Sequence, residues 1–349
     1  MKTLFGLFLG AMAFSALAAP LEIDRPWQGI SDPLIFGRTY NRSFTRLPLN
    51  GQIKNKNRLW SGDYWPLNKG NINYRWFARE KIGFNLKSPG KTQSSTATQA
   101  QLSALSPSEK YDIFTGRYDY PLKAWVDSIS SPNALKWEGI CHGWAAASIN
   151  HNEPVPVIVT NPDGIKIPFG TTDIKALLSY YYAYGFQSTS IQMGQRCYPE
   201  SGDGCQEDMN AGAFHIVLAN RLGIEGLSFI ADIESTGEVW NNPAYQYTSY
   251  VVKELRPYAD SARGTVKVVR VRTDFYFADN GDNSWRPVIG TYLQVIKKHQ
   301  YEYDLDLDAS GNIIGGTWLS KLRPDFLWLK GRPSKFNGIL SRLGELTND

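Results

Sequence analysis

Cys141 has the sequence context of a reactive thiol. It lies in the segment Trp137-Glu-Gly-Ile-Cys-His-Gly-Trp144, directly ahead of an alanine run that favours a helix. A thiol reacts as its thiolate, and the backbone N–H groups at the start of a helix lower the pKa of a sulfur placed there. A buried, inert cysteine is the alternative. The neighbouring Gly139 and Gly143 and the place before the helix favour a nucleophile that forms an acyl-enzyme.

The other two cysteines have a different context. Cys197 and Cys205 are eight residues apart in a loop-like segment that contains one proline and two glycines. Such a segment can bring two Cα atoms within disulfide distance, and accessible cysteines of an exported protein tend to pair. We therefore predict a Cys197–Cys205 disulfide. This pairing leaves Cys141 as an unpaired thiol, which needs its own explanation.

A thiol nucleophile needs a base that takes its proton and later protonates the leaving amine. Among the four histidines, His215 is our first choice, because it begins the apolar segment 214–219, which we interpret as a strand facing the cysteine helix. Asp232 ends the next expected strand and can orient the imidazole, with Asn241 and Asn242 as rivals for that role. Ordinary core residues at strand ends are the structural alternative for both His215 and Asp232.

Acyl transfer also needs hydrogen-bond donors for the oxyanion. The backbone N–H of Cys141 is the first choice, and the side chain of Lys136 or Trp137 could add a second donor. Trp137, Trp144 and Trp240 could form the walls of a cleft that excludes water and admits a lysine side chain. Core packing would explain these three tryptophans equally well.

The start of the chain indicates export. Met1-Lys2 is followed by the apolar run 4–17 and by the small residues Ala16-Leu17-Ala18, as in a signal peptide cleaved after Ala18. No later stretch approaches the ~20 apolar residues of a membrane span. We expect a secreted or periplasmic protein. The net charge is +4 with scattered Lys and Arg, which gives no reason to expect a nucleic-acid partner.

Helical patterns precede strand patterns, which predicts an α+β fold. Three regions are expected: the signal peptide (1–18), an irregular wrapping segment that could include a pro region (19–130), and a Cys/His core with a β-rich extension (131–349). Residues 87–103 are rich in Ser, Thr and Gln, which indicates a mobile loop that could be cut during activation. Helices are expected at 106–114, 122–130, from 141 onward and at 172–184, and strands at 214–219, 227–232, 245–255, 264–277, 291–307 and 313–319.

One segment has part of a calcium-binding pattern. Counted from Asp306, the oxygen side chains of Asp308 and Ser310 and the glycine at 311 match an EF-hand loop. Position twelve is Thr317, where that loop needs a bidentate glutamate, and the flanking segments are expected strands. A β-hairpin turn is the better explanation, so Asp306 and Asp308 are weak metal candidates.

Three segments resemble the transglutaminase elicitors of oomycetes and their bacterial relatives. They are the segment 137–147 around Cys141, the segment Glu238-Val-Trp-Asn-Asn-Pro-Ala-Tyr245, and the aromatic cluster 60–66 together with 323–328. The second segment is similar to the surface peptide that plants recognise in the oomycete proteins. Asn242 and Ala244 stand where that peptide has Gln and Val.

The resemblance implies a papain-like cysteine-enzyme core, in which a helix carrying Cys141 packs on an antiparallel sheet carrying His215. It also implies acyl transfer from a protein glutamine to a lysine or other amine, with Ca²⁺ dependence. A papain-like protease or amidase is an alternative on the same core. A non-catalytic protein whose 239–243 loop is read by a partner is a second alternative. Amine incorporation, peptide cleavage or neither would separate the three.

Overall fold

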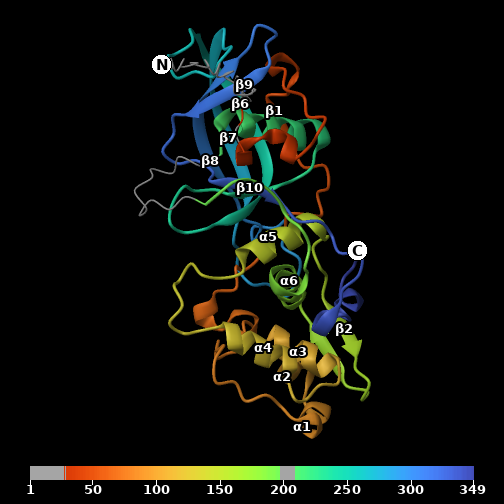
Figure 1. Cartoon of the computed structure of the whole chain (residues 1–349). Helices are drawn as coiled ribbons and strands as arrows, with labels where there is room; N and C mark the ends of the chain where they lie inside the picture. Colours follow the sequence, from red (N-terminus) through yellow and green to blue (C-terminus); the bar gives the residue numbers. More distant parts are fainter. Residues whose placement is uncertain (1–26, 28, 197–208) are drawn as a thin grey trace, which may run out of the picture.

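The computed structural model describes residue 27 and residues 29–196 and 209–349. The expected signal peptide and the expected Cys197–Cys205 disulfide lie outside the described residues. The molecule is elongated, with a large sheet in one half and helices α1–α4 in the other, while α5 and α6 lie between them (Figure 1). Among the described helices, none has the length and apolar character needed to cross a membrane.

The large sheet is antiparallel and has the strand order β4-β10-β5-β6-β7-β8-β9, with β1 paired to β6. A separate hairpin joins β2 and β3. The expected strands from 245 onward are confirmed, and in β7 and β9 buried residues largely alternate with more exposed ones, as in strands that pack one face on a core. The strands are β1 Asn50–Gln52, β2 Val157–Thr160, β3 Lys166–Phe169, β4 Ile191–Gly194, β5 Ile230–Asp232, β6 Asn241–Leu255, β7 Lys267–Ala278, β8 Ile296–Leu307, β9 Ile313–Trp318 and β10 Phe326–Leu329.

The four expected helices are present. Helix α5 begins at Cys141 itself. Helices α6 and α7 are each extended by a π-helical segment. The α-helices are α1 Lys91–Thr96, α2 Gln99–Ser103, α3 Pro107–Phe114, α4 Pro121–Ile129, α5 Cys141–Asn150, α6 Thr171–Tyr180 and α7 Ala211–Leu218; the π-helices are Tyr181–Gly185 and Ala219–Glu225. Short 3₁₀ helices occupy Gly29–Ser31, Pro33–Ile35, Phe44–Arg46, Leu67–Lys69, Asn71–Asn73, Gly338–Leu340 and Leu343–Glu345.

Two local predictions are wrong. Residues 214–219 belong to α7 and its extension rather than to a strand. The side chain of Asn210 caps α7 by accepting from the N–H groups of Gly212 and Ala213, and a helix buried on every side has the same uninterrupted apolar pattern as a buried strand. The expected loop at 87–103 contains α1 and α2, because its Ser, Thr and Gln side chains satisfy helix ends. Thr98 and Gln101 form a capping box at the start of α2.

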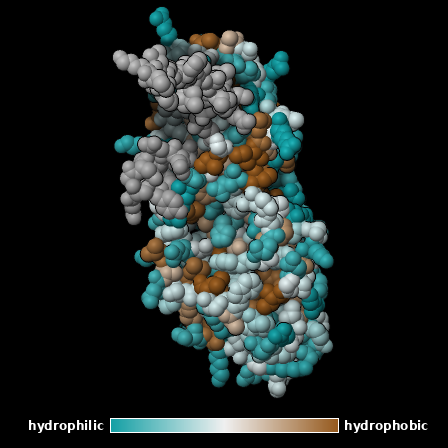
Figure 2. All heavy atoms as spheres, in the orientation of Figure 1, coloured by the Kyte–Doolittle hydropathy of each residue, from teal (hydrophilic) through white to brown (hydrophobic). Residues whose placement is uncertain are grey.

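Two hydrophobic cores hold the fold together. The first contains α3–α6 and includes Cys141, and the second lies between α7 and the large sheet. The irregular segment before α1 contributes Trp60, Trp65, Ile72 and Trp76 to the first core. On the face seen in Figure 2, the helical half shows mostly hydrophilic and intermediate side chains, with apolar side chains in separate patches.

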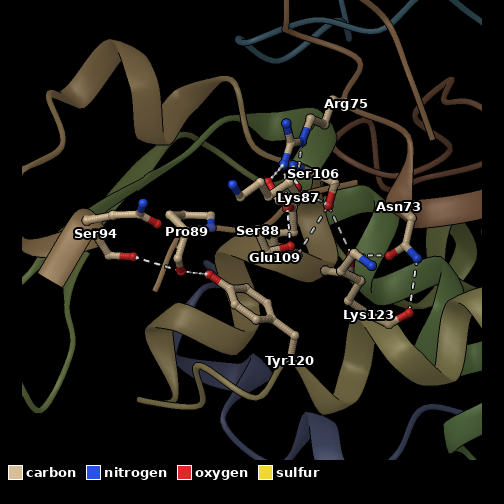
Figure 3. Close-up of polar contacts among 12 residues, drawn as sticks. Asn73, Arg75, Lys87, Ser88, Pro89, Ser94, Ser106, Glu109, Tyr120 and Lys123 are labelled. Atoms are coloured by element: carbon tan, nitrogen blue, oxygen red, sulfur yellow. Dashed lines mark hydrogen bonds and ion pairs between the residues drawn. The ribbon is translucent and has the colours of Figure 1, made fainter. Parts of the chain in front are cut away.

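A buried carboxylate fastens the segment before α1 to α3. Glu109 accepts two hydrogen bonds from Arg75, at 2.8 and 2.5 Å, and one from Ser88 at 2.6 Å (Figure 3). The backbone N–H of Ser106 donates to the same carboxylate at 3.0 Å. The described part of the region 19–130 is therefore tied together by this polar network, and it shares the first hydrophobic core with the helix that carries Cys141.

Candidate active site

Two glycines allow the backbone around Cys141 to pack tightly. A Cβ on Gly139 would lie 2.5 Å from the backbone oxygen of Tyr64, and one on Gly143 would lie 2.1 Å from the backbone oxygen of Ser179 in α6. The N–H of Ile140 donates to the same Tyr64 oxygen at 2.7 Å. The start of α5 is thus fixed on one side by the Tyr64 segment and on the other by α6.

The thiol of Cys141 faces the start of β6. The residue is 5% exposed and unpaired, and its Sγ lies 3.6 Å from the backbone oxygen of Val239. The Nδ2 group of Asn241 donates toward the same sulfur at 3.7 Å. Trp328, on β10, donates its indole N–H to Oδ1 of Asn241 at 2.7 Å.

Asp232 is held by the same short segment. It ends β5, where it pairs with Asn241 across the sheet, and its Oδ1 accepts from the backbone N–H of Trp240 at 2.9 Å. Its Oδ2 is buried without a hydrogen-bond partner in the described structure. Three consecutive residues, 239 to 241, therefore contact both the thiol and the carboxyl group.

Burial governs the protonation of both groups. It raises the pKa of Asp232 to about 8, and the charge of Asp325 acts in the same direction. Burial also raises the pKa of the Cys141 thiol; hydrogen bonds from the backbone and side chain of Asn241 lower it, and the charge of Asp232 raises it again. The sequence predicted an ionised sulfur at the helix start. At neutral pH the structure instead favours a protonated Cys141 thiol and a largely protonated Asp232 carboxyl group.

A cavity of about 220 Å³ gives access to the thiol. It is lined by Leu67, by five residues of the segment Trp137–His142, and by Val239 and Asn241. His142, the residue after Cys141, also lines this cavity. Burial lowers the pKa of its imidazole to about 4, so the ring is neutral at physiological pH.

The structure does not bring His215 to Cys141. His215 lies on α7 in the second core, where its Nδ1 contacts the Tyr303 hydroxyl at 2.8 Å and its ring lies beside Phe44. Its Nε2 has no hydrogen-bond partner in the described structure, and burial alone lowers its pKa to about 4. Among the described contacts of His215, none reaches the thiol. The residue expected as the base therefore lies on helix α7 rather than on a strand of the sheet.

Comparison with known proteins identifies the family. Residues 129–341 match the family described as "Transglutaminase elicitor". This chain belongs to the transglutaminase elicitor family. Its fold is similar to that of the GP42 transglutaminase from Phytophthora sojae, with a TM-score of 0.67, 22% identity, and coverage of 90% of this chain and 94% of the other. Comparison with curated protein sequences returned no match.

Of the tryptophans and the lysine that the sequence suggested for the site of this elicitor-family chain, only one lines the cavity. Trp137 lines the cavity, with the Arg196 guanidinium 5.5 Å from the centre of its ring. Trp144 is a core residue that donates to the backbone oxygen of Trp60. Trp240 is half-buried and packs edge-on against Tyr64, with ring centres 5.4 Å apart. Lys136 meets the site through its backbone oxygen, which accepts from the Tyr64 hydroxyl at 2.7 Å.

The segment that resembles the elicitor peptide is largely internal. Residues 241 to 244 are buried in β6, between β5 and β7. Asn242 donates from Nδ2 to the backbone oxygen of Ala278 at 2.9 Å and to Asp279 at 3.1 Å. In this member of the family the segment forms part of the thiol site rather than an exposed loop.

Both calcium candidates are hydrogen-bonded to backbone N–H groups. Oδ2 of Asp306 accepts from the backbone N–H of Ala262 at 2.9 Å. The Asp308 carboxylate closes the β8–β9 turn by accepting from the N–H groups of Ser310 and Asn312. Among the described residues, no group of three or more His, Cys, Asp or Glu side chains could hold a metal ion. Asp308 thus stabilises the β8–β9 turn, while Asp306 is hydrogen-bonded to the segment between β6 and β7.

Proposed function

We propose that this protein is an exported protein-glutamine γ-glutamyltransferase in which Cys141 is the nucleophile and Asp232 the proton acceptor. The observation that carries the proposal is the segment 239–241, which contacts both groups from one strand start. Membership of the family supports the reaction class. The cavity beside the sulfur supplies space for a carboxamide side chain.

The first half-reaction forms a thioester. Asp232, as its carboxylate, accepts the thiol proton while the sulfur of Cys141 attacks the side-chain carbonyl carbon of a substrate glutamine. The C–S bond forms, and the tetrahedral intermediate then loses ammonia, which takes the proton back from Asp232. The N–H groups around Cys141 and Asn241 stabilise the negative oxygen of the intermediate.

The second half-reaction transfers the acyl group. The primary amine of a lysine attacks the thioester carbon, and its surplus proton passes through Asp232 to the departing sulfur. An isopeptide bond forms and the thiol is regenerated. Attack by water at the same step would give glutamate. The apolar lining from Leu67, Trp137 and Val239 disfavours water, which supports transfer over hydrolysis.

The test is amine incorporation with matched variants. A glutamine-containing peptide and a fluorescent primary amine are incubated with wild type, Cys141→Ala, Asp232→Asn and His215→Ala, with and without Ca²⁺. Incorporation by wild type and its loss in the first two variants support the proposal. Retention of activity in folded His215→Ala supports Asp232 as the acceptor, and the exposed control Asp260→Asn should match wild type. Peptide cleavage without incorporation would indicate a protease. No activity that depends on Cys141 would indicate a non-catalytic binding protein.

A further inference from the structure

The amide of Asn241 can have two orientations, and a neighbour from another strand selects one of them. The indole N–H of Trp328 is a donor only, so its 2.7 Å contact must be with the amide oxygen. This leaves Nδ2 directed at the sulfur of Cys141, 3.7 Å away. In the reverse orientation two N–H donors would face each other, and an oxygen lone pair would face the sulfur.

The sheet itself fixes this arrangement. Trp328 is 8% exposed and pairs with Ile230 of β5, while Asp232 of β5 pairs with Asn241 of β6. The indole therefore reaches across β5 to the amide. A buried amide with both its ends engaged has little freedom to rotate, because either unpaired end would lose a hydrogen bond away from water.

We propose that Trp328 is a positioning residue that holds the Asn241 amide as a side-chain donor, first to the Cys141 thiolate and then to the oxyanion of the acyl-transfer intermediate. This assignment rests on the proposed transglutaminase function. It gives Asn241 the role that the sequence offered to Lys136 or Trp137. The same Nδ2 group serves both species because negative charge passes from sulfur to oxygen over a short distance during the attack.

Packing alone is the competing role for Trp328, since its ring belongs to the first hydrophobic core. The two roles differ in what they control. A packing residue affects stability and the amount of folded protein, whereas a positioning residue also changes the ionisation of the thiol in the protein that remains folded.

The experiment compares the pH dependence of Cys141 alkylation by iodoacetamide in wild type and Trp328→Phe, which keeps a ring and removes the donor. The matched control is Trp318→Phe, because Trp318 donates an indole N–H to the backbone oxygen of Met209, also at 2.7 Å, away from the thiol. We expect the alkylation midpoint of Trp328→Phe to rise by about half a pH unit or more, while that of Trp318→Phe stays at the wild-type value. Asn241→Ala should shift the midpoint in the same direction.

Kinetics give the second readout. For Trp328→Phe we expect kcat to fall roughly tenfold with KM nearly unchanged, less than the ~10²-fold loss typical of removing an oxyanion donor outright. Trp328→His, whose imidazole can donate an N–H, should recover part of the loss. Trp328→Leu is a second variant without a donor, in case Trp328→Phe does not fold.

An unchanged alkylation midpoint in folded Trp328→Phe or Trp328→Leu would overturn the proposal. So would failure of both variants to fold, since Trp328 would then be a packing residue. Alkylation needs no substrate, so the two proposals can fail separately. A wild-type protein that never incorporates amine, but whose alkylation midpoint depends on Trp328, would remove the proposed function and leave the positioning role.

Discussion

At the residue scale, Cys141 and Asp232 are two buried acids, and in the resting protein at neutral pH both are mainly protonated. Burial raises the pKa of both, and for both it is the largest effect. A neutral pair avoids the cost of placing an isolated charge in the core. The reactive state therefore forms only when the carboxyl group loses its proton and can accept the one on sulfur.

The pH dependence of activity follows from this pair. Asp232 has a pKa of about 8 and must be ionised to accept the thiol proton, so kcat/KM should rise with pH through about 8. An imidazole base of ordinary pKa would place the rise near pH 6.5. Steady-state rates of amine incorporation from pH 5.5 to 9.5 distinguish the two. A plateau already reached at pH 7 would contradict Asp232 as the base.

The same carboxyl group should make stability depend on pH. Its folded pKa of about 8 lies above the unfolded value of about 3.9, so the folded state holds a proton that the unfolded state releases. This contribution is complete below pH 4 and is lost as pH rises toward 8. Asp232→Asn removes the dependence, and its free energy of unfolding should gain about 2–3 kcal/mol relative to wild type between pH 5 and pH 7.

Urea unfolding of both proteins at the two pH values measures this difference. Asp260→Asn, which changes an exposed carboxyl group, serves as the control. A gap between wild type and Asp232→Asn that is equal at pH 5 and pH 7 would show that Asp232 titrates normally in the folded protein.

At the element scale, the close approach of α5 to α6 places the sulfur. Gly143 permits this approach, because any Cβ there would meet the backbone oxygen of Ser179 at 2.1 Å. Backbone atoms cannot move aside as a flexible side chain can, so α5 would have to shift away from α6.

Gly143→Ala adds only one methyl group, but it should lower the free energy of unfolding markedly. We expect a loss of about 1–3 kcal/mol in the free energy of unfolding, as for other overpacked core sites. Ala145→Gly, a change of the same size on the same helix, is the comparison for loss of helix propensity, at about 1 kcal/mol. If thermal unfolding of Gly143→Ala resembles that of wild type, α5 and α6 are not in such close contact.

The helices and strands also show which parts of the fold could be predicted from the sequence and which could not. The helix at Cys141 and the strands of the C-terminal half were predictable, because local alternation and the alanine run determine them. The helix α7 was not, because residues buried on every side lose the periodicity that separates helix from strand. That error placed His215 on the sheet. The contact between Asn241 and Cys141 joins residues 100 positions apart, and it is created by the packing of α5 against β6.

At the scale of the whole molecule, the segment before residue 130 is part of the structure that supports the thiol. Lys110 of α3 and Asp173 of α6 form an ion pair at 2.7 Å, with both side chains fully buried. Trp76 also donates to Asp173, at 2.8 Å. Burial lowers the pKa of Lys110, and its pairing with Asp173 opposes that shift. This buried ion pair therefore joins the N-terminal segment to the core helices, and separating its two charges would cost free energy.

Asp173→Asn should leave the Lys110 charge buried without its counterion. Removing one member of a buried pair typically costs 3–5 kcal/mol, so we expect a loss of about that size in urea unfolding. Asp119→Asn, in the exposed pair with Arg117, is the control and should leave the unfolding midpoint unchanged. A mild effect of Asp173→Asn would indicate that α3 and α6 separate easily, as a removable pro region would require.

The central claim is that the Cys141 thiol carries a glutamine acyl group to an amine. Intact-mass spectrometry of a glutamine-containing peptide, incubated with a primary amine and either wild type or Cys141→Ala, tests it most directly. We predict that wild type alone increases the peptide mass by that of the amine minus ammonia. A wild-type product that carries no amine, or the same product formed by folded Cys141→Ala, would contradict the account.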